Sequence, residues 1–247
     1  NTALGHNAMA VNTTGTQNVA VGYNSLDANT TASYNTAMGH AALSACTTGA
    51  GNTAVGQISQ DDITTGAQNT AIGAGSGHAL TTGSANTSLG YLANSNNTTG
   101  NHNISLGFSA NPSTTTASAQ CTLGDANITN LRCNDTSISA LSDSRDKTDV
   151  IDSPYGLDFI NTVRPVQFKW ETRDGNIKDG STRVGFLAQE LLAATDGNNA
   201  VLDLVLDDNP EKLEAKYGNL VPIMAQAIKE LSAKNDALEA RLSTLEG

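Results

Sequence analysis

Aromatic side chains and positive charge are both scarce in this chain of 247 residues. Aromatic residues make up 4% of it, too few to fill a conventional globular core throughout. No Lys or Arg precedes Arg132 and the formal net charge is −11, which argues against nucleic acid as a partner, because phosphates bind to clustered basic residues. No apolar run approaches the roughly 18 residues of a membrane-spanning helix, so we expect no membrane partner.

Cysteine is also rare. Cys46, Cys121 and Cys133 are odd in number and irregularly spaced, which predicts unpaired thiols rather than a disulfide framework or a zinc site. His6 and His40 share a column of the repeat described below, but other residue types occupy that column in the remaining copies. We therefore expect no metal and no cofactor.

What the first half does contain is a repeat of 17 residues, which predicts a stacked solenoid. Its glycines recur at this spacing without a slip: Gly5, Gly22, Gly39, Gly56, Gly73, Gly90, Gly107 and Gly124. A large apolar residue, here called Φ, precedes each glycine, and an Asn stands four residues before it in seven of the copies. The consensus is N-T-A-Φ-G, a variable stretch, and T-T-G.

Two glycine-marked corners predict two short strands in each repeat. In N-T-A-Φ-G, the Φ column and the Ala column point to opposite faces. We expect one face to form the chain's own core and the small Ala face to lie against neighbouring chains, as a trimeric β-roll or β-helix. The repeats resemble those of phage fibres and trimeric adhesin heads. The Thr-Thr columns suggest either an ice-binding or glycan-binding face or, more simply, the β-propensity of Thr.

The repeat fades after Gly124, and the composition then changes: the only Trp and nearly all of the charge follow. The predicted organisation is a β shaft of repeats at 1–124, a linker at 125–141, a small α+β domain at 142–218 and a coiled-coil helix at 219–247.

Four segments beyond the shaft resemble one known family. Leu141 to Lys147 (LSDSRDK) is similar to the S-D-x-R-x-K motif that opens the intramolecular chaperone auto-processing domain of endosialidases, of many phage tail spikes and fibres, and of myelin regulatory factors. The segments RPVQFKW at 164–170, GFLAQE at 185–190 and YGNLVPIMAQAIKEL at 217–231 resemble its later motifs, in the same order.

The resemblance implies autoproteolysis at the Leu141–Ser142 bond, with Ser142 as nucleophile and Lys147 as base. Asp143 would orient the nucleophile or stabilise the local turn. Residues 141–247 contain no His, so a Ser-His-Asp triad within this domain is excluded. Lys can act as the base only where burial or a positive neighbour, such as Arg145, lowers its pKa. Two alternatives stay open: an ordinary polar turn at this motif, or an uncut chaperone that remains as a cap.

The C-terminal segment shows 3-4 apolar spacing, which predicts a trimeric coiled coil rather than a helix packed on its own domain. The a positions are Val221, Ile228, Asn235 and Leu242, and the d positions are Met224, Leu231, Leu238 and Leu245. The Asn at one a position is the kind of residue that fixes register.

These features together predict a homotrimeric viral tail fibre or spike, located in the virion and assembled in the host cytoplasm. Its receptor would be a glycan or protein of the host surface. The alternatives are the C-terminal part of a glycan depolymerase of the endosialidase kind, whose catalytic head would lie upstream because residues 1–140 carry only five acids, and a trimeric surface adhesin. A membrane-bound transcription factor of the myelin regulatory kind fits least, since no basic DNA-binding region is present.

Overall fold

The computed structural model describes residues 1–128, 130–132, 134, 142–171 and 180–246. The chain forms two compact units, Asn1–Asn130 and Leu131–Gly247. No helix of the described residues is both long enough and apolar enough to cross a membrane.

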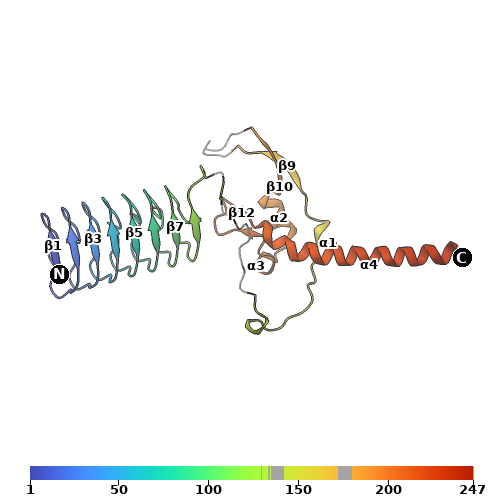
Figure 1. The fold of residues 1–247 in the computed structure, drawn as a ribbon, viewed down its shortest axis with the longest axis horizontal. Helices are drawn as coiled ribbons and strands as arrows, with labels where there is room; N and C mark the ends of the chain where they lie inside the picture. Colours follow the sequence, from blue (N-terminus) through green and yellow to red (C-terminus); the bar gives the residue numbers. More distant parts are fainter. Residues whose placement is uncertain (129, 133, 135–141, 172–179, 247) are drawn as a thin grey trace. The chain divides into compact units, whose positions relative to one another are not determined.

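The first unit is a β-solenoid, as the repeat predicted (Figure 1). Each repeat contributes one strand of three residues to a parallel sheet, and every strand pairs with the strand 17 residues later without a change of register. The strands are β1 (Thr2–Leu4), β2 (Val19–Val21), β3 (Thr36–Met38), β4 (Thr53–Val55), β5 (Thr70–Ile72), β6 (Thr87–Leu89), β7 (Ile104–Leu106) and β8 (Cys121–Leu123).

The prediction of two strands per repeat was wrong, because the rest of each repeat is built from turns. Three columns of each turn hold residues with positive φ, two of them shortly after the conserved glycine; Ile58 (φ 49°) and Gln60 (φ 50°) are examples. Left-handed residues reverse the chain within a few positions, so no second strand can form. The Thr-Thr columns likewise lie in bends rather than strands.

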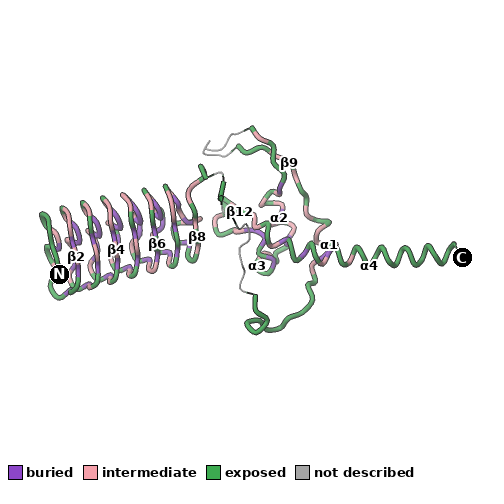
Figure 2. Tube along the Cα trace, in the orientation of Figure 1, coloured by how far each residue is buried: buried purple, intermediate pink, exposed green. Residues whose placement is uncertain are grey.

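The two faces of the sheet are also the reverse of our expectation. Ala20, Ala37 and Ala54 of the Ala column are fully buried in the core of their own chain. The Φ column points outward, and Leu4, Met38, Ile72, Leu89 and Leu123 are exposed. The interior is narrow and receives Leu26, Leu43, Ile63 and Leu80 from the turns, so only a small side chain fits opposite them. Figure 2 shows the buried positions as bands that recur in each turn.

Asparagine stabilises the stack from inside. The Nδ2 of Asn52 donates to the carbonyl of Gly66 (2.9 Å), and its Oδ1 accepts from the backbone N–H of Asn69 (3.0 Å). The same pair of bonds is made by Asn18, Asn35, Asn69, Asn86 and Asn103. Buried backbone groups of the turns thus find partners that a sheet would otherwise supply.

The second unit is a small α+β domain followed by a long helix, as predicted. Its elements are η1 (Ser144–Asp146), α1 (Leu157–Ile160), β9 (Val166–Lys169), β10 (Thr182–Gly185), α2 (Ala188–Ala194), α3 (Asn199–Leu202), β11 (Val205–Leu206), β12 (Glu214–Ala215), η2 (Tyr217–Asn219) and α4 (Leu220–Glu246). β9 and β10 form one antiparallel pair, and β11 and β12 form another. Leu191, Leu204, Val205, Leu220 and Ile223 lie at the centre of the core.

Among the aromatic side chains of this unit, Phe159 and Phe186 pack against the core. Trp170 is 48% exposed and instead meets Phe168 edge-on, with ring centroids 5.3 Å apart. The single Trp of the chain therefore lies outside the core of its domain.

Helix α4 has two distinct apolar faces. Leu220, Ile223 and Ala227, in its first turns, are buried against the domain. The apolar side chains at the predicted a and d positions all point away from it and are exposed: Val221, Met224, Ile228, Leu231, Leu238, Leu242 and Leu245. The helix thus packs on its own domain through one face, while the 3-4 stripe remains unpartnered in the single chain.

Candidate functional site: the Ser142–Lys147 segment

A short capped turn forms the segment that was predicted to be catalytic. Asp143 is the N-cap of η1: its Oδ1 accepts a hydrogen bond from the backbone N–H of Arg145 (2.9 Å). The guanidinium of Arg145 closes back onto the same carboxylate, with Nη2 2.6 Å from Oδ2. Asp favours an N-cap because its carboxylate satisfies an N–H that the helix leaves free. The sequence Asp-Ser-Arg therefore fixes the turn locally.

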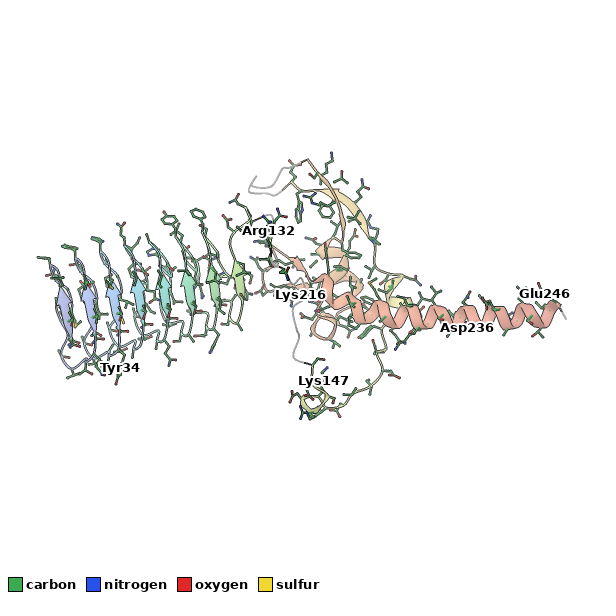
Figure 3. All side chains as sticks on the ribbon, in the orientation of Figure 1. Tyr34, Arg132, Lys147, Lys216, Asp236 and Glu246 are labelled. Carbon is green, nitrogen blue, oxygen red and sulfur yellow. The ribbon has the colours of Figure 1, made fainter. Side chains whose placement is uncertain are left out.

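This turn brings the serine and the lysine together. After η1 the backbone is extended at Lys147, and its N–H donates to the carbonyl of Ser144 (3.3 Å). The Lys147 Nζ then donates a hydrogen bond to Ser142 Oγ over 2.6 Å (Lys147 is labelled in Figure 3). This separation lies within the reach of a nucleophile and its base. Two of the predicted site residues thus meet within one chain.

Asp143 does not point at this pair. Both of its carboxylate oxygens accept hydrogen bonds from the Arg145 guanidinium. The Arg145 guanidinium lowers the pKa of Asp143, and the carboxylate in turn raises the pKa of Arg145. The charge of Arg145 is therefore compensated by Asp143 and is not directed at Lys147.

The other predicted features of the site can be placed only in part. Leu141, which carries the carbonyl of the predicted scissile bond, lies outside the described residues. Ser142 and Lys147 are both exposed. Lysine acts as a general base only where burial or a nearby positive charge disfavours its protonated form.

The remaining motif segments contact one another within the second unit. Arg164 pairs with Glu190, which connects the RPVQFKW segment to the GFLAQE segment. The backbone N–H of Phe186 donates to the Tyr217 hydroxyl (3.2 Å), which connects GFLAQE to the segment that begins α4. The later motif segments are therefore the ones that contact one another in this fold. Ser142 and Lys147 precede all of them in the sequence.

Glu230 makes a contact that the sequence reasoning missed. Its carboxylate accepts from the backbone N–H of Leu157 (2.8 Å), at the start of α1, and from Gln226 (3.0 Å). The backbone hydrogen bond to Leu157 is the main cause that lowers the pKa of Glu230. Position 230 was already part of the closing motif, but only the fold shows that its partner lies 73 residues away.

A metal or cofactor has little to bind at the Ser142–Lys147 segment, whose carboxylates belong to Asp143, already paired, and Asp146. Among the described residues, the group whose side chains could jointly hold a metal ion lies in the shaft, at Asp61, Asp62 and His78.

Comparison with protein families gives a match for residues 142–202, to Peptidase_S74, the chaperone of endosialidase. Comparisons with curated proteins and with solved structures gave no match. The matched segment begins at Ser142, the residue that the Lys147 side chain contacts, and ends at Leu202 of α3, before the segment at 217–231. Beyond its solenoid of 17-residue repeats, this chain therefore contains a segment, residues 142–202, that is similar to the Peptidase_S74 family, the chaperone of endosialidase.

Proposed function

We propose that the chain is part of a homotrimeric viral tail fibre or spike, in which the solenoid is the shaft and the second unit is an intramolecular chaperone that cuts itself off at the Leu141–Ser142 bond. The observation that carries this proposal is the contact of Lys147 Nζ with Ser142 Oγ, at the residue where the family match begins. In this role the protein belongs to the virion and contacts a glycan or protein of the host surface.

Two unpartnered apolar surfaces support a trimer. The Φ column gives the shaft an exposed apolar ladder with the same spacing in every repeat, and α4 exposes its a and d positions. Contiguous apolar surface of this kind marks interaction sites. Because the chains of a homotrimer are identical, the spacing of the apolar residues is the same in each of them. Asn235, at an a position and hydrogen-bonded to Glu239 (3.1 Å), would set the register of the helices.

The need for a chaperone follows from the repeats themselves. Pairing β4 with the wrong strand of a neighbouring chain would place identical residue types opposite each other, so a slip by one repeat costs little. Helices that pair first in a defined register would hold three shafts at the same height. The repeats of the three shafts would then pair one after another, beginning at that end.

Cleavage would proceed through an ester. Ser142 Oγ attacks the carbonyl carbon of Leu141 while Lys147 Nζ accepts the hydroxyl proton, and the carbon–nitrogen bond between Leu141 and Ser142 breaks as that proton passes to the leaving amine. Water then hydrolyses the ester, which leaves a carboxylate on Leu141 and a free amine on Ser142. Because Lys147 is exposed in the single chain and a lysine base needs a desolvated position, we propose that a neighbouring chain covers it in the trimer.

The test is the mass of freshly expressed protein, both intact and under native conditions, for wild type, Ser142→Ala and Ser144→Ala. We expect wild type and Ser144→Ala to separate before Ser142 into a trimeric shaft and a released fragment, and Ser142→Ala to remain an uncut trimer. Uncut trimers of all three proteins would refute the cleavage and leave the domain as a permanent cap. A monomer of the uncut Ser142→Ala chain would refute the fibre.

A further inference from the structure

The turn after β4 brings together three side chains that the proposed function does not use. Asp61 and Asp62 are adjacent in this turn, and His78 stands one repeat later, 17 residues after Asp61. Because β4 and β5 pair in register, His78 lies beside Asp61, with Nδ1 2.5 Å from Oδ1. One ligand atom from each of the three side chains lies within 4.8 Å of the others.

This donor set suits a particular class of ion. An imidazole nitrogen with two carboxylate oxygens binds zinc and related divalent transition metals, whereas calcium and magnesium prefer oxygen ligands alone. Donors held by one zinc ion at about 2.0–2.2 Å lie roughly 3–4 Å apart. The three ligand atoms lie close to that spacing, so a bound ion would draw them together through rotation of the side chains.

The charge balance of the shaft also favours a bound cation at these residues, and this argument does not depend on the distances. The chain has no Lys or Arg before Arg132, so the shaft offers no permanent cation to two adjacent carboxylates. The Asp61 side chain is only 16% exposed. Two adjacent carboxylates, one of them partly desolvated, therefore face a single imidazole as their nearby basic group.

We propose that Asp61, Asp62 and His78 bind a divalent transition-metal ion of the zinc class, which clamps the repeat of β4 to the repeat of β5. The remaining coordination positions belong to water. This site is separate from the Ser142–Lys147 segment and does not depend on the proposed cleavage.

The experiment uses the full chain with Ser142→Ala as background, stripped with a chelator and titrated with Zn²⁺ by calorimetry. We expect one Zn²⁺ per chain, lost in His78→Gln and weakened at least about tenfold in Asp62→Asn. Two matched controls are His40→Gln, a histidine that stacks on Tyr23, and Asp27→Asn, the acid two repeats before Asp61 in the same column. Both controls should bind Zn²⁺ as the background protein does.

A structural readout separates a built site from an adventitious ion. X-ray absorption of the zinc-loaded protein should show one imidazole and otherwise oxygen ligands, and the same concentration of Zn²⁺ should raise the thermal midpoint of the shaft less in Asp62→Asn than in the background protein. Asp62 is exposed, so its substitution leaves the fold intact. Absence of stoichiometric binding, or equal binding by His78→Gln and by the controls, would overturn the proposal.

Discussion

The side-chain oxygen of Asn35 accepts a hydrogen bond from the backbone N–H of Asn52 over 2.8 Å, and thereby joins two successive repeats of the solenoid. Asn52 repeats the arrangement with Asn69 and also donates to Gly66. Both partners of each bond are buried, so water cannot replace a lost partner.

Substitution of this column should therefore be costly. Asn52→Ala leaves the N–H of Asn69 and the carbonyl of Gly66 without partners, and we expect the shaft to lose about 2–6 kcal/mol of stability, at roughly 1–3 kcal/mol for each orphaned group. Denaturant unfolding of the Ser142→Ala protein, followed by far-UV circular dichroism, measures the change. Thr48→Ala, at an exposed position, should stay within about 0.5 kcal/mol. Equal losses for both variants would contradict the role of the Asn ladder.

Glycine is required in the N-T-A-Φ-G motif for two reasons: the backbone of the next repeat lies very close to it, and its φ is positive. At Gly56, φ is +137°, and an added Cβ would lie 2.5 Å from the carbonyl oxygen of Gly73. Gly56→Ala should therefore separate two repeats and lower the unfolding midpoint severely. The matched control is Gly51→Ala: φ is +72° there, the nearest atom would lie 3.7 Å away, and Ala85 adopts a φ of 57° in the same column. We expect that control to cost about 1 kcal/mol. A mild effect of Gly56→Ala would show that the stack can open at this column.

The interior contains a polar residue whose removal should stabilise the protein. Gln60 is fully buried, and neither atom of its amide has a hydrogen-bond partner among the described residues. The same column holds Leu26 and Leu43 in earlier repeats. Gln60→Leu should raise the stability of the shaft by about 1 kcal/mol, because a buried amide without a partner carries its full cost of desolvation. Leu43→Gln is the reciprocal variant and should destabilise. A lower unfolding midpoint for Gln60→Leu would mean that its amide is satisfied.

The period of the solenoid could be predicted from sequence because the constraints that create it are local. Gly56 and Asn52 occupy positions where one residue type alone satisfies the contacts made, and such columns repeat visibly. Which face of the strand lies inside could not be predicted, because the size of a side chain does not show how much room faces it. Ala54 is buried since Ile63 and Leu43 fill the interior from the turns, and those residues lie outside the conserved motif.

The contacts of the candidate site could likewise be predicted from the sequence only in part. The Ser142–Lys147 contact could be predicted because both residues lie in one short motif that folds locally around Asp143. The contact between Glu230 and Leu157 could not, since it depends on the packing of α1 against α4. The sequence carries no spacing rule for such a pair.

This last contact makes the docking of α1 on α4 sensitive to acid. The pKa of Glu230 is lowered in the folded chain, chiefly by the hydrogen bond from the N–H of Leu157. A carboxylate with a lowered pKa contributes stability above its unfolded pKa, about 4.3, and loses that contribution as the pH falls through the folded value. From pH 7 to pH 5 we therefore expect no change, and below about pH 4 we expect the amide of Leu157 to lose protection against hydrogen exchange.

Glu230→Gln should show weaker protection of this amide already at pH 7, whereas Glu246→Gln, at the exposed end of the helix, should behave as wild type. Unchanged protection of Leu157 in Glu230→Gln at neutral pH would show that packing, and not this carboxylate, holds α1 in place.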